Sequence, residues 1–138
     1  MIPKFRAWDK EGNRMILPKY LYSIDLLKEQ VTERTKCNYT FSLHSIPLDK
    51  VELMQSTGLK DKNGKEVFEG DILTDGHTLG VLRNHQTLGF YMVDEKGKEN
   101  FLSDTVDIEG FEEAKEFMKN SIEIIGNIYE NPELLEVE

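Results

Sequence analysis

Short runs rich in apolar residues, separated by glycine-containing turns, constrain the fold of residues 67–97 most strongly. Gly70, Gly76 and Gly97 lie between or beside these runs, where glycine allows a sharp reversal of the chain. Short strands at close and regular spacing are typical of a small barrel or sandwich. We therefore predict a mainly β protein. The predicted strands of this region are residues 67–68, 72–73, 80–83 and 90–93.

The N-terminal part of the chain contains patterns that predict added strands. Residues 4–8 alternate between polar and less polar side chains, and residues 15–17 can form the return strand. We expect Gly12 to take the positive φ that such a reversal often needs. Residues 20–36 fit both a helical and a strand period, and we expect a short helix or an irregular segment there.

Residues 37–46 have the clearest alternation of the N-terminal half. Tyr39 and Phe41 alternate with polar residues, which predicts a half-buried strand that Pro47 ends. Cys37 has no neighbouring histidine and lies on the apolar face of this predicted strand. We therefore expect a buried structural thiol rather than a nucleophile.

The second half of the chain adds a turn, a helix and a strong final strand. Asn63-Gly64 is the strongest hairpin-turn pair, since both residues tolerate a positive φ. Residues 111–119 carry apolar side chains at helical spacing, which predicts a short helix. Residues 122–129 are strongly apolar and predict a strand, in which Gly126 indicates a bulge or the close approach of another backbone.

The charge of the chain limits the partners that we expect. It carries 17 Lys and Arg against 26 Asp and Glu, a net charge of −9, and residues 101–138 hold 2 basic and 11 acidic side chains. Nucleic-acid affinity depends on basic side chains that displace counterions, so we do not expect nucleic acid as a partner. No window offers the roughly 20 apolar residues of a membrane helix, and the start lacks the apolar stretch of a signal peptide. One cysteine suits a reducing compartment, so we expect a cytoplasmic protein.

The most conspicuous motif is Glu69-Gly70-Asp71. Its two carboxylates can lie together at a loop end and bind a cation or a basic peptide. Alternatively, Gly70 makes a sharp turn into a strand, and Asp71 caps that turn through backbone amides. The second interpretation requires no ligand.

A second acidic turn has the residue types of a calcium loop but not its spacing. Counted from Asp61, the fifth position is the cation Lys65, where an EF-hand loop needs a ligand. His44, His77 and His85 belong to no metal-ligand spacing. We predict no catalytic residue, metal ligand or cofactor. The candidate binding residues are Gln55, Asp61, Asn63, Glu69 and Asp71.

Three segments of the chain resemble one known family. They are KFRAWD at residues 4–9, LMQSTGLKDKNGKEVFEGDIL at residues 53–73 and IIGNIYENPEL at residues 124–134. In this order they resemble the N-terminal, central and C-terminal signatures of the YopX protein family, whereas residues 18–48 match no part of it. The resemblance implies a phage or prophage protein, mostly of Gram-positive hosts, whose core is similar to an SH3-like β-barrel. It implies no reaction, substrate or functional residue.

We therefore expect an SH3-like barrel over residues 48–138, with residues 1–47 packed on it as an extension of strands plus a short helix. For function, we expect a non-catalytic protein-interaction or self-assembly module, which includes a homo-oligomer, and not an enzyme. The alternative is an acidic DNA mimic or host-takeover factor that binds a basic host protein. A nucleic-acid-binding barrel is the least favoured hypothesis, because the net charge opposes it.

Overall fold

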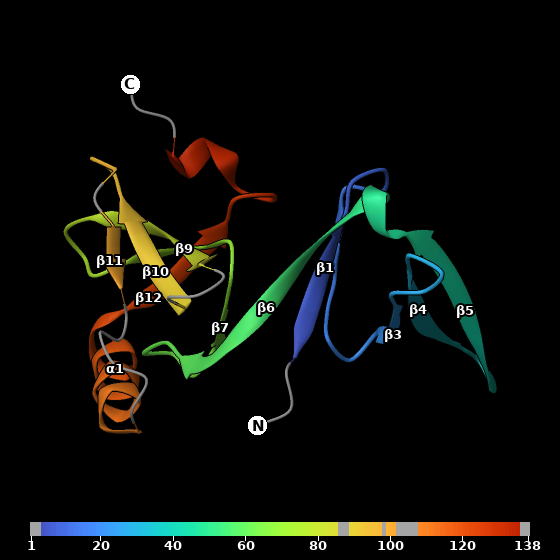
Figure 1. Cartoon of the computed structure of the whole chain (residues 1–138), viewed down its shortest axis with the longest axis horizontal. Coiled ribbons are helices and arrows are strands. Elements are labelled where there is room, and N and C mark those ends of the chain that lie inside the picture. The colour runs from blue at the N-terminus through green and yellow to red at the C-terminus, as the bar shows by residue number, and fades with distance from the viewer. Residues whose placement is uncertain (1–3, 86–88, 98, 102–107, 136–138) are drawn as a thin grey trace. The chain divides into compact units, whose positions relative to one another are not determined.

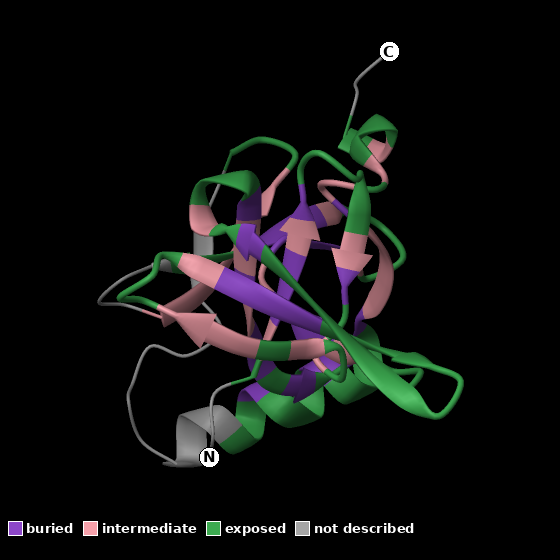
Figure 2. Ribbon diagram, turned by 90° about the vertical axis from the view of Figure 1, so that its right-hand side faces the viewer, coloured by how far each residue is buried: buried purple, intermediate pink, exposed green. Residues whose placement is uncertain are grey.

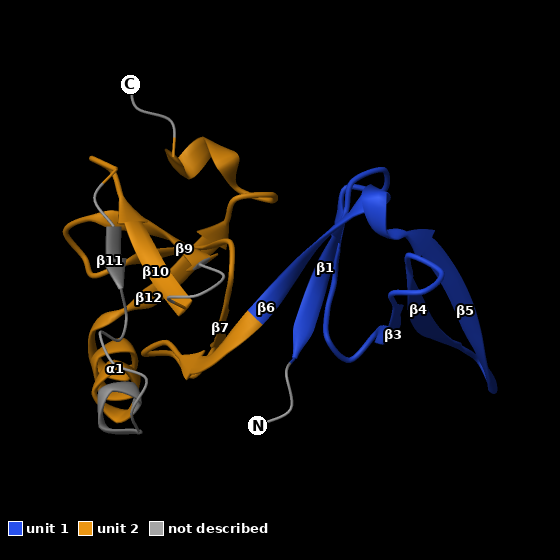
Figure 3. Cartoon of the chain, viewed as in Figure 1, with its two compact units in different colours: residues 1–55 blue, residues 56–138 orange. Residues whose placement is uncertain are grey.

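The structure, a computed structural model, describes residues 4–85, 89–97, 99–101 and 108–135 (Figure 1). The chain divides into two compact units, residues 1–55 (unit 1) and 56–138 (unit 2) (Figure 3). Strands form most of the described residues of the chain, accompanied by one described α-helix, α1 (Ile108–Ser121). The prediction of a mainly β protein is therefore confirmed.

The first sheet of unit 1 is built on β1 (Phe5–Asp9). This strand pairs antiparallel with β2 (Arg14–Ile16) and with the first half of β6 (Val51–Lys60). The predicted hairpin of β1 and β2 is confirmed, but Asn13, not Gly12, has the positive φ, at 51°. Asparagine tolerates this conformation because its short side chain bonds locally. The buried core of the unit consists of Ala7, Ile16, Val31, Ile46 and Val51.

The second sheet of unit 1 has three antiparallel strands. Its central strand is β4 (Gln30–Cys37), which lies between β3 (Leu21–Asp25) and β5 (Thr40–Pro47). A short 3-10 helix, η1 (Leu48–Lys50), connects β5 to β6. Because β4 is central, β3 and β5 both present an open edge within this sheet.

The expectation of a short helix or an irregular segment over residues 20–36 is wrong. Asp25 ends β3, and its Oδ1 accepts hydrogen bonds from the backbone N–H groups of Leu27 and Lys28, both at 3.0 Å. Glu29 then has a positive φ of 53°, which turns the chain back into β4. Pairing of the two strands lets apolar side chains from both contact one core.

The strand predicted over residues 37–46 corresponds to β5, but its predicted burial is wrong. Every side chain from residue 34 to residue 45 is exposed, at the outer end of the β4–β5 hairpin (Figure 2). Cys37, expected to be a buried thiol, is an exposed free cysteine. A strand face is buried only when a second layer covers it, and no described segment covers this part of the hairpin.

Unit 2 is built on a five-stranded antiparallel sheet of order β11-β10-β9-β8-β12, which curls into a half-barrel (Figure 1). β12 follows α1 in the chain and returns beside β8, while β7 (Glu66–Phe68) pairs with the second half of β6. A 3-10 helix, η2 (Pro132–Leu135), follows the sheet. The sheet strands are β8 (Asp71–Thr74), β9 (Leu79–His85), β10 (Gly89–Asp94), β11 (Glu99–Phe101) and β12 (Glu123–Asn127).

Helix α1 completes the core of unit 2. Ala114 and Met118 lie one helical turn apart and belong to the same buried cluster as Leu73 and Leu82. The helix predicted over residues 111–119 is confirmed, and it begins earlier, at Ile108. Burial of this apolar stripe joins the helix to the strands that form the sheet.

Two local predictions for unit 2 are confirmed. The register of β12 against β8 shifts between Ile124 and Gly126, which is the bulge that the glycine predicted. Asn63-Gly64 forms the turn between β6 and β7, where Gly64 has a φ of 80°. Gly64 has a backbone conformation that glycine adopts without steric cost, whereas Gly126 leaves room for the side chain of Asn131.

An ion pair between a buried carboxylate and a partly exposed guanidinium links the two sheets of unit 1. The Arg14 guanidinium donates from Nη1 and Nη2 to the two carboxylate oxygens of Glu33, each at 2.6 Å. Arg14 Nε also lies 3.3 Å from Asp9 Oδ2. Hydrogen bonding from Arg14 lowers the pKa of Glu33, against the opposing effect of burial. Glu33 therefore stabilises unit 1 only while its carboxyl group is ionised.

We expect Glu33→Gln to lower the free energy of unfolding of unit 1 by about 2 kcal/mol, because it removes one charge of this pair. Fluorescence of Trp8, the single tryptophan, reports this unfolding because it lies in β1. Glu52→Gln is the control: its pair with Lys10 is about half exposed, so the loss should be about 0.5 kcal/mol or less.

The acid dependence of stability gives a second readout for Glu33. Because its folded pKa is lowered, its contribution is complete above the unfolded pKa and disappears as the pH falls through the folded pKa. The Glu33→Gln variant should therefore lose less stability on acidification than the wild type. Equal acid dependence in the two proteins would contradict the role assigned to this carboxylate.

Candidate functional site

Asp61, a predicted binding residue, is a buried anchor in unit 2, with 1% of its surface exposed. Its Oδ1 accepts hydrogen bonds from the backbone N–H groups of Asn63 and Lys65, both at 2.9 Å, and its Oδ2 accepts one from Ile124 at 3.0 Å. Burial raises the pKa of Asp61, but these hydrogen bonds together outweigh it, so the pKa lies below its ordinary value. Asp61 thus ties the β6–β7 turn to β12, and Asn63 is exposed at that turn.

Asp71 also has a structural partner. Its Oδ2 accepts a hydrogen bond from the backbone N–H of Phe68 at 2.8 Å, across a turn in which Gly70 has a φ of 88°. Glu69 is half-buried in the same turn, whereas Gln55 is half-buried in β6 and belongs to unit 1. The role of these residues in binding stays a prediction. Among the described residues, no group of three His, Cys, Asp or Glu side chains is arranged to hold a metal ion.

The β4–β5 hairpin of unit 1 places basic side chains opposite apolar ones. Arg34 is the cross-strand partner of Leu43, and Lys36 is the partner of Phe41. Residues directly opposite each other in an antiparallel pair point to the same face of the sheet. The turn that sets this register contains Asn38, which has a positive φ of 53°. The two cations therefore share one exposed face with an aromatic and an aliphatic side chain.

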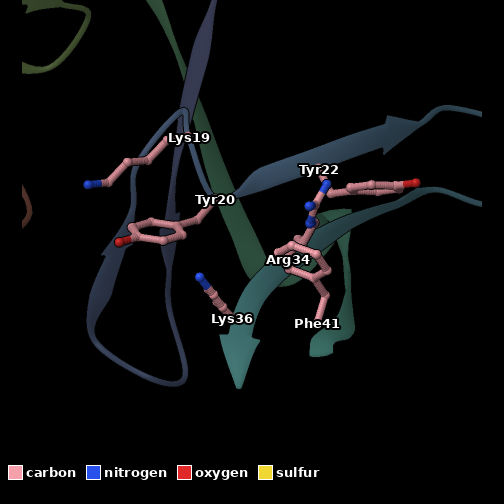
Figure 4. A pocket seen from close by; sticks show the side chains of 6 residues that line it. All are labelled: Lys19, Tyr20, Tyr22, Arg34, Lys36 and Phe41. Atoms are coloured by element: carbon pink, nitrogen blue, oxygen red, sulfur yellow. The ribbon is translucent and has the colours of Figure 1, made fainter. Parts of the chain in front are cut away.

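This face forms a pocket of about 290 Å³ on unit 1 (Figure 4). The guanidinium carbon of Arg34 lies 3.6 Å from the ring centroid of Phe41 and 5.9 Å from that of Tyr22. Lys19 Nζ lies 5.0 Å from the centroid of the Tyr20 ring. We name the whole surface the aromatic–cationic face. Its lining residues are Lys19, Tyr20, Tyr22, Arg34, Lys36 and Phe41.

The charges of the aromatic–cationic face are all positive. Lys19, Arg34 and Lys36 form no salt bridge with any described residue. Tyr22 and Phe41 are 57% and 55% exposed. A guanidinium stacked on a ring keeps its N–H edges available for a bidentate bond to a carboxylate or phosphate. The face can therefore bind an anionic group and an apolar side chain at the same time.

This face was not predicted from the sequence, although a signal for it was present. A period of two predicts a strand, but it does not tell a buried face from one that remains in solvent. Arg34 and Lys36 precede a two-residue turn at residues 38–39, and Phe41 follows it. Pairing across such a turn puts the cations beside the aromatic ring. Tyr20 and Tyr22 join them because β3 pairs with β4, and the Arg34 N–H donates to the Tyr20 carbonyl at 2.8 Å.

Unit 2 has a larger pocket, of about 420 Å³, between β9, β10 and η2. Its walls include apolar strand residues together with Leu134 and Leu135 of η2. Arg83 lies at this pocket with Asp94 and Glu95, so its charged groups have both signs. Because charges of both signs line this pocket, it favours neither an anionic nor a cationic ligand. The aromatic–cationic face is therefore the stronger candidate for a binding site.

These features define a class of protein: a mainly β chain of two compact units with an exposed aromatic–cationic surface. The model of the YopX protein family matches residues 4–136, nearly the whole chain. The chain belongs to the YopX family, as the three signature segments indicated.

The chain is also similar to a solved structure over nearly its whole length. The crystal structure of protein EF1440 from Enterococcus faecalis is similar to this chain over 99% of both chains, with a TM-score of 0.61 and 28% sequence identity. No curated protein matches the chain. Among the described residues, no helix has both the length and the apolar character needed to cross a membrane.

Proposed function

We propose that the protein is a non-catalytic interaction module of the bacterial cytoplasm, and that it binds its partner through the aromatic–cationic face. One observation carries the proposal: Arg34 stacks on Phe41 beside Tyr22 at an exposed surface where no described carboxylate pairs with it. The exposed thiol of Cys37 is consistent with a reducing compartment.

The energetics of interfaces support this use of the face. Arginine and tyrosine are enriched among the few residues that dominate binding energy in protein interfaces. Contiguous apolar surface is uncommon on a protein that has no partner. Covering Tyr22 and Phe41 would remove apolar area from water, while Arg34 and Lys36 would orient an acidic partner. The six lining residues include no carboxylate, imidazole or thiol, which fits binding rather than catalysis.

The proposal is tested with the variant Arg34→Ala/Phe41→Ala. Tagged protein is mixed with bacterial lysate and with untagged copies of itself, then cross-linked and quantified by mass spectrometry. The partners retained by the wild type should fall by about tenfold with the variant. Tyr39→Ala is the matched control, because Tyr39 is fully exposed in the same hairpin but does not line the face. Unchanged retention by a correctly folded double variant would refute the proposed function.

An alternative function follows from the uneven charge. Residues 1–55 hold 9 basic and 7 acidic side chains, whereas residues 56–138 hold 8 and 19. A protein whose second unit carries a net charge of −11 is a candidate acidic mimic of DNA that binds a basic host protein. This alternative predicts binding that weakens strongly with salt and does not change in Arg34→Ala/Phe41→Ala.

A further inference from the structure

We infer that the occupant of the aromatic–cationic face is a second copy of this chain, and that one side of its helix α1 makes the contact. The inference rests on the proposed function, since it names the partner of the same face. Three observations carry it: the composition of that side of α1, the spacing of its charges, and the charge of the whole chain.

Helix α1 has an exposed side on which an aromatic residue and carboxylates lie together. Phe117 is 53% exposed, and Glu113 and Glu116 are exposed too. Glu113 lies four residues before Phe117 and three before Glu116, so its side chain neighbours both of the others on the helix surface. Glu116 and Phe117 are consecutive and point about 100° apart around the helix axis. Ala114 and Met118 are directed into the core of unit 2 instead.

The lysines of α1 lie on a different part of its surface. At 3.6 residues per turn, Lys115 and Lys119 are on the flank away from Phe117, and Lys119, three residues after Glu116, borders that carboxylate on the far side. Neither Glu113 nor Glu116 forms a salt bridge within the described part of the chain. The exposed side of α1 is therefore apolar at Phe117, which borders the buried stripe, and negative at Glu113 and Glu116, which complements the aromatic–cationic face.

The spacing of the two glutamates on α1 is similar to the spacing of the two cations on β4. Residues three apart on a helix have Cβ atoms about 5–6 Å from each other. Arg34 and Lys36 are two residues apart on β4, which separates them by about 7 Å. Glu113 and Glu116 can thus reach the two cations together while Phe117 contacts the rings of Tyr22 and Phe41. The pocket of about 290 Å³ suits an inserted side chain.

The charge of the chain favours a second copy over a nucleic acid. The net charge of −9 opposes the binding of a polyanion anywhere on the chain, because its 26 acidic side chains exceed its 17 basic ones. A second copy instead brings carboxylates and an aromatic ring to the three cations, and its own face remains able to bind another copy. This contact joins the aromatic–cationic face of one copy to helix α1 of the next, so the two copies associate head to tail.

The experiment is a charge exchange followed by sedimentation at about 50 mM salt, where surface charges are weakly screened. One variant is Arg34→Glu/Lys36→Glu, and the other is Glu113→Lys/Glu116→Lys. Wild-type protein at about 100 μM should sediment above its monomer mass of 16.0 kDa. Each variant alone should associate at least about 30-fold more weakly, and an equimolar mixture of the two should recover association to within about fivefold. Lys115→Glu/Lys119→Glu, with the same change of net charge as the first variant, should associate like the wild type.

Recovery in the mixture is the decisive result, since misfolding or net charge cannot produce it. A wild type that remains monomeric, or a mixture that does not recover, overturns the inference. The proposed function is refuted by a different result, namely that Arg34→Ala/Phe41→Ala retains every partner of the wild type. A labelled single-stranded oligonucleotide serves as a third probe: retention by the wild type and loss with Arg34→Glu/Lys36→Glu would assign the face to nucleic acid and overturn the second copy as its occupant.

Discussion

Substitution of Asp61 by alanine should lower the free energy of unfolding of unit 2 by about 3 kcal/mol, since it removes a buried carboxylate that accepts hydrogen bonds from three backbone N–H groups. The carboxylate lies inside the unit, so water does not easily replace it. Asp61→Asn keeps one acceptor oxygen but presents an NH₂ group to one of the donors, and its loss should be intermediate. Hydrogen exchange at β12 and the helical circular dichroism of α1 report this unit.

Asp75→Ala is a suitable control for Asp61→Ala. Asp75 Oδ1 also accepts hydrogen bonds from two backbone N–H groups, those of His77 and Thr78, but in an exposed turn. Water replaces these bonds in the variant, so its stability should change far less. Comparable losses in the two alanine variants would contradict the anchoring role of Asp61.

The pH dependence of stability should change with Asp61 as well. Its folded pKa lies below the ordinary value, so its contribution is complete above the unfolded pKa and is lost as the pH falls through the folded pKa. The wild type should therefore lose stability on acidification, and Asp61→Ala should lack that part of the loss. An unchanged acid profile of the variant would contradict the lowered pKa.

The second large effect is expected for Gly126→Ala, which should destabilise unit 2 by about 2–3 kcal/mol through overpacking. A Cβ at this position would lie 2.5 Å from Oδ1 and 2.9 Å from Cβ of Asn131. The Cβ contact cannot be relieved by a rotation of the side chain, so the backbone after β12 must shift. That shift weakens the hydrogen bond from the Asn131 N–H to the carbonyl of Asn127, which is 2.9 Å long.

Two further variants isolate the cause. Gly80→Ala is the control: its nearest contact is the terminal methyl of Met92 at 3.1 Å, which moves easily. Asn131→Gly removes the opposing side chain, so Gly126→Ala should cost much less in that background. Denaturant unfolding of the wild type, Gly126→Ala, Asn131→Gly and the double variant forms a double-mutant cycle. Additive losses would show that the predicted clash is absent.

Local properties of the sequence were sufficient to predict much of the secondary structure of unit 2. Strand positions followed from apolar runs between turns, the helix from the spacing of Ala114 and Met118, and the bulge from Gly126. Each of these depends on residues that are close in the chain, whose conformational preferences act before any distant contact forms. The same reasoning identified the turn at Gly64 and the structural alternative for Asp71.

The candidate site depended on distant contacts, and there the sequence was insufficient. Asp61 has the residue type of a ligand, and only the return of β12 beside it makes it an anchor. The aromatic–cationic face was hidden for the opposite reason, because the period of two in β5 predicted burial of Phe41.

The sequence by itself determined the mainly β class, the helix, the turns and the excess of acidic charge, because these follow from local spacing and composition. Only the tertiary structure decided which alternating face a second layer covers and which remains in water. Burial is a property of the segments that pack together, and those segments are far apart in the chain.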